Sequence, residues 1–244
     1  MNKKIAVVTG PCGGIGSAIT AQLISDGLHV IGLDIKQSQL DQMSEKYGAD
    51  FTPIAIDLSD AKAITQAFSE IAKTFGGLDA LVNNVGNCFM SEFPNIPAQE
   101  FELQMSINFS AAFFCSQEAV KLMLARPGIK KIVNISSNGA YNFDVFDPPH
   151  YRASKAALDN LTKDLARRYA IEGISVNSIA PAMTESPLFN VLTKEILEKA
   201  LAQMPRGKAM QPSEIAAWVG FLISPAGDIS SGNVIILNQG RDVR

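Results

Sequence analysis

Histidine and cysteine are scarce in this sequence. Two histidines and three cysteines occur among 244 residues, and Cys12, Cys88 and Cys115 lie far apart, without C-x-x-C or Cys/His spacing. The sequence therefore predicts no metal site, and it predicts reduced, mostly buried thiols of the kind found in a cytosolic protein.

Long apolar runs and clusters of positive charge are also missing. The first apolar run, residues 5–8, stops at Thr9 and Gly10, and no stretch reaches the roughly 18 residues of a membrane span or resembles a signal segment. The net charge is -3, with lysine and arginine scattered along the chain. This pattern argues against a nucleic-acid or membrane partner, so we expect a cytoplasmic protein with a small-molecule substrate.

What the chain does have is a regular alternation of two patterns. Short β-branched runs alternate with segments of helical periodicity, such as residues 16–27 and 63–76, each of which ends in glycine. With 47% hydrophobic residues, the length suits one large core. We predict an α/β fold: a single doubly wound Rossmann-type domain over residues 1–244, with about seven parallel strands and helices on both faces. The predicted strands cover residues 5–8, 29–33, 52–56, 80–84, 131–136, 174–179 and 233–237.

Irregular stretches follow three of the predicted strands. They cover residues 86–97, 138–149 and 182–206, of which 182–192 is the least regular part. Open α/β sheets bind ligands at the carboxyl ends of their strands, so we expect these loops to surround a substrate. Their apolar residues, which either contact an apolar substrate or anchor the loops on the sheet, are Phe89, Met90, Phe93, Tyr141, Phe143, Phe146, Met183, Leu188 and Phe189.

A glycine-rich turn follows the first strand. In VTGPCGGIGSA, Gly10, Gly14 and Gly16 lie between a predicted strand and a predicted helix. Glycines there allow the backbone to approach a pyrophosphate at the helix N-terminus, although tight turns also use glycine without any ligand. Because this is the first strand-to-helix turn in a chain of alternating strands and helices, we favour the interpretation that it binds a dinucleotide.

Asp34 ends the second strand, HVIGLD, about 20 residues beyond the glycine turn. A carboxylate at this position can accept hydrogen bonds from the adenosine ribose and repels a 2′-phosphate. The sequence therefore predicts NAD rather than NADP, with Lys36 as the one nearby cation. The alternative is an ordinary exposed carboxylate at a strand end.

Tyr151 and Lys155 are spaced one helical turn apart in HYRASK. Residues i and i+4 share a helix face, so the ammonium could favour the phenolate and lower a pKa that is normally near 10. A tyrosine of this kind can act as an acid or base near neutral pH.

Together these motifs resemble the short-chain dehydrogenase/reductase family over nearly the whole chain. Thr9, Gly10, Gly14, Ile15 and Gly16 match its T-G-x-x-x-G-x-G turn, NNVG at 83–86 its N-N-A-G motif, and APAMTES at 180–186 the region of its P-G-x-x-x-T motif. By this resemblance the catalytic residues are Asn108, Ser137, Tyr151 and Lys155. The cofactor would be held by Gly10, Gly14, Ile15, Gly16, Asp34, Ile35, Asp57, Leu58, Asn84, Gly86, Tyr151, Lys155, Pro181, Thr184 and Ser186.

The resemblance also implies a role for each catalytic residue. Tyr151 is the acid/base, and Lys155, with the positive ring of the oxidised nicotinamide, lowers its pKa and holds the nicotinamide ribose. Ser137, for which Ser136 is the competing choice, hydrogen-bonds the substrate oxygen, and Asn108 kinks its helix to seat a water. His150 is not expected to be catalytic, because neighbouring residues on a helix point in different directions.

Several positions depart from the family pattern. The spacing from Ser137 to Tyr151 is 14 residues, one more than is common, so the wall of the active site is expected to differ. Ala182 and Ser186 replace a glycine and a threonine, and Asn238 and Gln239 alter the C-terminal turn. The lone tryptophan, Trp218, is expected in the core.

We predict an NAD-dependent oxidoreductase that transfers a hydride between nicotinamide and a secondary alcohol or ketone, apolar and alicyclic or aromatic-derived. One alternative is a 3-oxoacyl-type NADPH-dependent reductase, which Asp34 disfavours. Another is a non-catalytic NAD-binding regulatory protein, against which the complete catalytic set argues. The resemblance also implies a homo-oligomer, most simply a tetramer.

Overall fold

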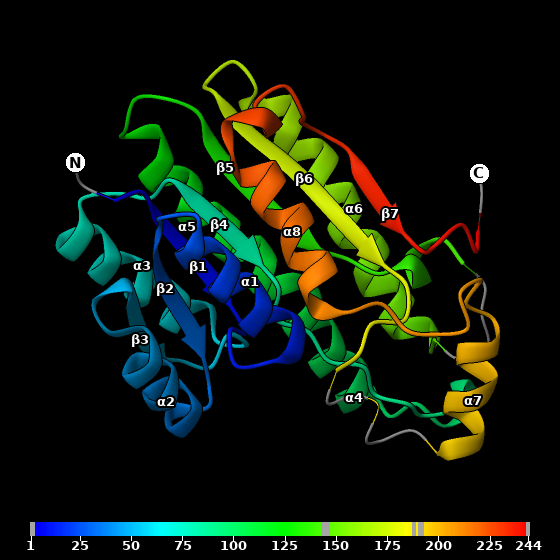
Figure 1. The fold of residues 1–244 in the computed structure, drawn as a ribbon. Helices are drawn as coiled ribbons and strands as arrows, with labels where there is room; N and C mark the ends of the chain where they lie inside the picture. Colours follow the sequence, from blue (N-terminus) through cyan, green and yellow to red (C-terminus); the bar gives the residue numbers. More distant parts are fainter. Residues whose placement is uncertain (1–2, 143–146, 187–188, 190–192, 243–244) are drawn as a thin grey trace.

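The fold is built on one seven-stranded parallel sheet with the strand order β3-β2-β1-β4-β5-β6-β7 (Figure 1). The computed structural model describes residues 3–142, 147–186, 189 and 193–242. The strands are β1 (Ile5–Thr9), β2 (His29–Asp34), β3 (Phe51–Ala55), β4 (Ala80–Asn83), β5 (Lys130–Ile135), β6 (Ile174–Pro181) and β7 (Val234–Leu237). The predicted fold class, a single Rossmann-type domain, is confirmed.

All seven predicted strands are present, and their ends differ from the prediction by at most two residues. The largest difference is in β6, predicted over 174–179, which runs on to Pro181 because Ala180 and Pro181 lie in register with Ile236 and Leu237 of β7. Pairing with a neighbouring strand is a tertiary effect that the local pattern does not contain.

The helices are α1 (Gly14–Ser25), α2 (Gln37–Tyr47), α3 (Ala61–Phe75), α4 (Ala98–Met105), α5 (Ala111–Leu124), α6 (Pro149–Tyr169), α7 (Lys194–Ala202) and α8 (Pro212–Ile223). Local sequence explains the bounds of α3. The Asp60 side chain accepts a hydrogen bond of 2.8 Å from the Lys62 amide, and Gly76 ends the helix in a left-handed conformation with φ 69°. The predicted glycine stop is therefore found here.

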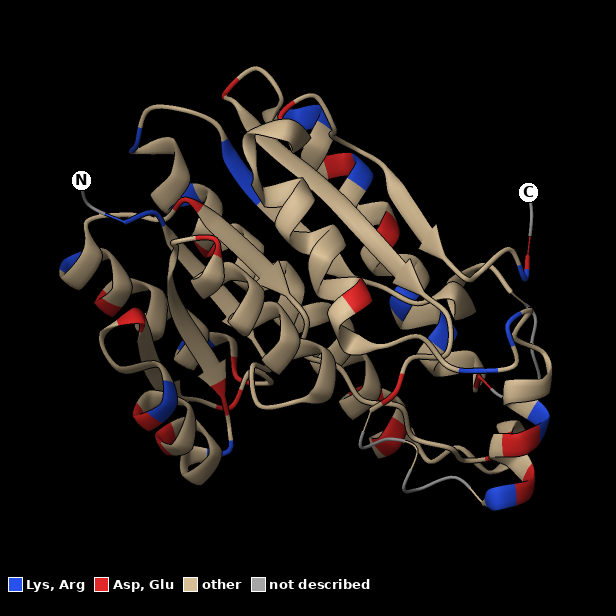
Figure 2. Ribbon diagram, in the orientation of Figure 1, with Lys and Arg blue, Asp and Glu red and all other residues tan. Residues whose placement is uncertain are grey.

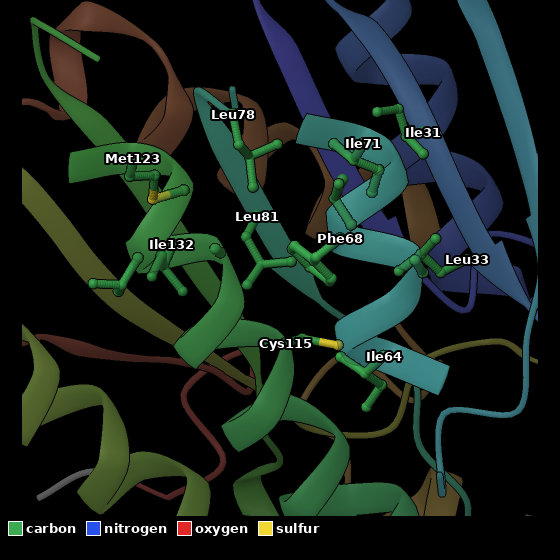
Figure 3. Close-up of a cluster of buried hydrophobic side chains, with 14 of the residues drawn as sticks. Ile31, Leu33, Ile64, Phe68, Ile71, Leu78, Leu81, Cys115, Met123 and Ile132 are labelled. Atoms are coloured by element: carbon green, nitrogen blue, oxygen red, sulfur yellow. The ribbon is translucent and has the colours of Figure 1, made fainter. Parts of the chain in front are cut away.

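Helices cover both faces of the sheet, and each face has its own apolar cluster. On one face α3 and α5 pack on the strands, with Phe68, Leu81 and Met123 in the interior (Figure 3). On the other face α1 and α8 pack on the same strands and contact each other. Strands buried on both faces explain why these runs are continuously apolar. The sheet thus provides a rigid platform whose carboxyl edge remains available for a site.

Charged residues lie mainly on the helices and loops, with both signs interspersed in the view of Figure 2. Two lysines at the start of β5 are exceptions, because both are buried. Lys130 lies 3.6 Å from an Asp79 oxygen and Lys131 lies 2.8 Å from an Asp228 oxygen, so each charge has an acidic partner. None of the helices within the described residues is long and apolar enough to cross a membrane.

Two sequence expectations need correction. The third loop, predicted over 182–206, contains the helix α7, which begins after a Thr193 side-chain cap. Trp218 is not in the core: it is 41% exposed on α8, where its ring packs edge-on against Phe221. The predicted loop residues Phe143, Phe146 and Leu188 lie outside the described residues.

Candidate active site

A cavity of about 240 Å³ opens at the carboxyl ends of β5 and β6. Of the predicted site residues, it collects Ile15, Ser137, Tyr151, Pro181, Thr184 and Ser186. Of the predicted loop residues, Met90, Met183 and Phe189 line it, together with the charged residues Asp147 and Arg241. The lining therefore combines an apolar wall with a few polar groups, as expected of a small-molecule site.

Ser137 and Tyr151 meet at this cavity. Ser137 follows β5 in an extended conformation, and its hydroxyl accepts a hydrogen bond of 3.0 Å from the Gly139 amide. The Ser137 hydroxyl is also hydrogen-bonded to the phenol of Tyr151, in the first turn of α6. Ser136 lies beneath, where its hydroxyl donates to an Asp159 oxygen at 2.9 Å. Between the two serines, the structure thus places Ser137 against Tyr151.

Lys155 lies one turn further along α6 and is buried. Its ammonium donates to the carbonyl of Ile135 at 2.9 Å, and a Cβ at Gly86 would come within 3.2 Å of it. Burial lowers the pKa of Lys155 to about 8, and the negative charge of Asp159 opposes this decrease. The ammonium is thus anchored to the end of β5 and close to the backbone of Gly86.

The pKa of Tyr151 differs from the sequence expectation. In the chain by itself, burial raises the pKa of the phenol well above its usual value of 10, the Asp147 carboxylate raises it further, and the hydrogen bond with Ser137 opposes both. Lys155 does not lower the pKa of Tyr151 in the chain without cofactor. The phenol therefore keeps its proton near neutral pH and is poised to donate it.

Asn108 lies in a short π-helical segment, Ser106–Ser110 (η3), between α4 and α5. Its Oδ1 accepts from the Asn87 amide at 2.8 Å, and its Nδ2 donates to the Asn87 carbonyl at 2.9 Å and to the Ser154 hydroxyl at 3.1 Å. The predicted irregularity in the helix is found. The asparagine ties the loop after β4 to the helix that carries Tyr151.

His150 points toward α4 and does not line the cavity. Its Nε2 lies 3.2 Å from a Glu100 oxygen, and Glu100 also accepts from the Ser91 hydroxyl at 2.7 Å. The expectation that His150 is not a catalytic residue therefore agrees with its place in the structure.

The glycine turn lies beside the cavity, between β1 and α1. Gly10 has a φ of 66°, and a Cβ at Gly16 would lie 2.0 Å from the Gly10 carbonyl oxygen, so neither position accommodates a side chain. No side chain caps the start of α1 at Gly13, which leaves backbone amides of the first turn available to an anion. The loop thus has the shape and the donors that a pyrophosphate requires.

Thr9 and Asn84 join the glycine turn to the end of β4. The Thr9 hydroxyl accepts from the amides of Asn84 and Val85 at 2.9 and 3.0 Å. The Asn84 amide group donates to the carbonyls of Thr9 and Gly10, both at 3.0 Å. These bonds fix the turn against the strand that leads to Gly86.

Asp34 lies at the carboxyl end of β2, and its side chain faces the glycine turn. One oxygen accepts from the Cys12 amide at 3.2 Å and the other from the Lys36 amide at 3.1 Å. The residue is 9% exposed, so it is not the ordinary exposed carboxylate considered as the alternative. Ile35 beside it is 65% exposed.

The remaining cofactor candidates lie along the same edge of the sheet. Asp57 is exposed after β3 and accepts from the Ser59 amide at 2.9 Å, while Leu58 is buried. Thr184 follows Pro181 and donates to the Ala182 carbonyl at 3.0 Å. In the altered C-terminal turn, Gln239 has a left-handed backbone conformation with a φ of 59°.

Comparison with known proteins decides the family. Residues 10–242 match the family model described as enoyl-(acyl carrier protein) reductase. The chain is 31% identical to a 3alpha-hydroxysteroid dehydrogenase from Mediterraneibacter gnavus, over 96% of this chain and 95% of that protein. It is 32% identical to the 3-oxoacyl-(acyl-carrier-protein) reductase FabG of Aquifex aeolicus, over 97% and 96%. The solved structure of a dehydrogenase/reductase from Sinorhizobium meliloti covers 100% of this chain and 96% of that one, with a TM-score of 0.90 and 31% identity.

The chain belongs to the short-chain dehydrogenase/reductase family. It is therefore an oxidoreductase that uses a nicotinamide cofactor and acts on hydroxyl or keto groups.

Sequence reasoning about this dehydrogenase/reductase assigned no role to two carboxylates near Tyr151 and Lys155. Asp147 lies in the segment that is one residue longer than usual and lines the cavity. Asp159 lies four residues beyond Lys155 and is buried with it. The i, i+4, i+8 spacing of Tyr151, Lys155 and Asp159 was the available signal, because such residues share one helix face.

Proposed function

We propose that the protein is an NAD-linked dehydrogenase that interconverts a secondary alcohol and a ketone at Tyr151. The observation that carries this proposal is the hydrogen-bonded pair of Ser137 and Tyr151 at an apolar cavity, with the ammonium of Lys155 one turn behind. A carbonyl oxygen placed between the two hydroxyls would receive two hydrogen bonds, which stabilise the charge that develops on it.

The residues present fit a nicotinamide dinucleotide. The glycine turn leaves no room for side chains but offers backbone amides, which suit a pyrophosphate, and Asp34 presents a fixed carboxylate for ribose hydroxyls. The loop after β4 and the segment from Pro181 to Ser186 would hold the nicotinamide end. When bound, the dinucleotide supplies or accepts the hydride.

Tyr151 handles the proton that accompanies the hydride. In reduction its protonated phenol donates to the forming alkoxide, and the raised pKa of Tyr151 keeps that proton available at neutral pH. In oxidation the phenolate must take the proton from the alcohol. Lys155 alone does not lower the pKa of Tyr151 in the free chain, so the positive ring of the oxidised nicotinamide would have to act together with the Lys155 ammonium to favour this charged form. Ser137 holds the oxygen in both directions.

The two directions should respond oppositely to pH. Because oxidation requires the phenolate, log kcat/KM should rise with pH and level off once the coupled Tyr151 and Lys155 unit has titrated. Reduction requires the protonated unit, so its kcat/KM should fall at high pH, beginning near the Lys155 pKa of about 8. Initial rates across the pH range in both directions check this, and parallel profiles would contradict the acid/base assignment.

For the substrate we propose an apolar secondary alcohol or ketone, alicyclic or aromatic-derived. Met90, Met183 and Phe189 on the cavity wall support this choice, as does the similarity to a protein named 3alpha-hydroxysteroid dehydrogenase. The similarity to 3-oxoacyl and acetoacetyl-CoA reductases favours the second candidate, a 3-oxoacyl-type reductase that works with NADPH.

A single screen separates these candidates. Nicotinamide absorbance is followed with NAD(H) and NADP(H) against cyclic and aromatic alcohols, their ketones, and acetoacetyl-CoA. Turnover of cyclic substrates with NAD(H) supports the proposal, and preferred reduction of acetoacetyl-CoA with NADPH favours the second candidate. Dinucleotide binding with no turnover of any member would indicate a non-catalytic NAD-binding protein.

We also propose a cytoplasmic homo-oligomer, most simply a tetramer. Exposed apolar side chains on α4 and α5, including Phe101, Leu103 and Phe113, together with Trp218 and Phe221 on α8, support association. Sedimentation at micromolar concentration should give a mass that is a multiple of the 26.2 kDa chain. A mass equal to one chain would contradict this.

A further inference from the structure

A buried carboxylate lies behind the catalytic pair, outside the cavity. Asp159 is on α6, one turn beyond Lys155, and is 3% exposed. The Ser136 hydroxyl donates to its Oδ2 at 2.9 Å and the Ser178 hydroxyl to its Oδ1 at 2.6 Å. The Tyr141 hydroxyl also bonds to this carboxyl group. The residue after β5, a residue of β6 and the residue after η4 (Asn138–Ala140) thus converge on one side chain.

The hydrogen bonds favour the ionised form of Asp159. A carboxylate accepts from hydroxyl groups on both oxygens, and three hydroxyls are in place to donate. Burial raises the pKa of Asp159, while the bonds from Ser178, Ser136 and Tyr141 and the charge of Lys155 oppose that rise. The buried ammonium of Lys155, one helical turn away, partly balances the buried negative charge of Asp159.

The carboxylate is linked to Lys155 through more than charge. The Ser136 hydroxyl that donates to Asp159 also lies 3.3 Å from the backbone carbonyl of Lys155. The Lys155 ammonium bonds to the carbonyl of Ile135, the residue just before Ser136. The end of β5 therefore holds the backbone, the ammonium and the carboxylate in one cluster.

Other charged groups around this cluster act differently. Asp147 acts on Tyr151 and Cys88, and raises the pKa of both. From α4, Glu100 pairs with His150, and Asn108 from η3 is neutral. Among the described residues, the charge of Asp159 and, to a smaller extent, that of Cys88 raise the pKa of Lys155, and Asp159 is the carboxylate of the two.

We propose that Asp159 is a positioning residue that keeps the Lys155 ammonium charged for the acid/base work of Tyr151. The carboxylate does not line the cavity, so it would act through Lys155. It compensates the burial of the ammonium, whose hydrogen bond goes to the uncharged carbonyl of Ile135. Burial and then the Asp147 charge keep the proton on the phenol, and the Asp159 charge opposes the loss of the lysine proton that burial favours. Below about pH 8 the free site therefore rests in the doubly protonated form that reduces a ketone.

The test measures Lys155 directly, without substrate. The full chain is labelled with [ε-¹³C]lysine, and the Lys155 resonance is identified by its loss in Lys155→Met. In the unmodified protein it should titrate near 8. In Asp159→Asn the midpoint should fall by about one unit or more, because an opposite charge nearby has been removed. Asp159→Ser, which keeps a small hydroxyl partner for Ser136 and Ser178, provides a second variant if the Asp159→Asn protein does not fold.

Thr162→Val is the matched control. Thr162 is buried on α6 and accepts from the Asn134 side chain at 2.8 Å, so its loss removes a buried hydrogen bond but no charge. The Lys155 midpoint should not move in this variant. An unchanged midpoint in both Asp159 variants would overturn the proposal, as would an equal fall in Thr162→Val.

This inference rests on the proposed function for its catalytic meaning, and a second measurement addresses that part separately. If Tyr151 and Lys155 carry the reaction, Asp159→Asn should lose about fivefold in reductive kcat/KM at pH 8, since the ammonium fraction falls from about a half to about a tenth. If the Lys155 midpoint falls in Asp159→Asn but kcat/KM does not, Asp159 does raise the pKa of Lys155, and the proposed part of Lys155 in catalysis is wrong.

Discussion

Tyr151→Phe is expected to abolish turnover while leaving NAD affinity within a few-fold of the unmodified protein. In the proposed mechanism the hydroxyl exchanges a proton with the substrate oxygen, and positioned proton transfer contributes about 10²- to 10⁴-fold to a rate. The rest of the ring remains to fill its place beside Ser137, so the nucleotide site at the glycine turn should be undisturbed. Steady-state rates and NADH fluorescence titration measure the two quantities separately.

Tyr169→Phe is the matched control for this substitution. Tyr169 ends the same helix, α6, and packs against the apolar cluster at a distance from the cavity. It should retain the activity of the unmodified protein. Turnover of Tyr151→Phe close to that of the control would mean that another group moves the proton.

The second large effect concerns the choice of cofactor, which Asp34 should decide in favour of NAD. A 2′-phosphate about 4 Å from a carboxylate meets a repulsion of roughly 4 kcal/mol at an effective dielectric near 20, before solvent and salt reduce it. A quarter to a half of this corresponds to a preference of about five- to thirtyfold, and lost ribose hydrogen bonds add to it. Because backbone amides of Cys12 and Lys36 hold both Asp34 oxygens, the carboxylate cannot readily turn away. We expect kcat/KM with NAD to exceed that with NADP by at least about tenfold.

Substitutions at this position should shift the preference in steps. Asp34→Ser should narrow the gap mainly by weakening NAD, and adding Ile35→Arg should begin to favour NADP, because Ile35 is exposed and its replacement costs little packing. Lys36→Ala is the comparison that removes the one nearby cation and should widen the gap. Equal or better use of NADP by the unmodified protein would show that Asp34 does not face the adenosine ribose.

The sequence predicts those parts of the site that depend on local spacing. The glycine turn and the pair Tyr151 and Lys155 follow from residues close together in the chain, and the structure places them at one edge of the sheet. The choice of Ser137 over Ser136 agrees with the hydrogen bond to Tyr151. Strand and helix periodicity was likewise sufficient for the fold.

Features that depend on burial and on distant partners could not be read from the sequence. The raised pKa of Tyr151 comes first from burial and then from Asp147, neither of which a helical spacing reveals. In the sequence Asp159 resembles an ordinary helix carboxylate, and only the structure shows that Ser136, just after β5, and Ser178 in β6 bond to it. Trp218 was misplaced because aromatic residues usually pack inside, whereas this one lies on the outer side of α8.

Transfer of deuterium from nicotinamide to product tests the central claim most directly. NADH carrying deuterium on both C4 positions is incubated with the ketone that gives the fastest rate in the screen, and the alcohol is analysed by mass spectrometry. The proposed mechanism predicts one deuterium on the carbinol carbon with the unmodified protein and with Tyr169→Phe, and almost no alcohol with Tyr151→Phe. Alcohol without deuterium, or labelled alcohol formed equally well by Tyr151→Phe, would contradict hydride transfer assisted by Tyr151.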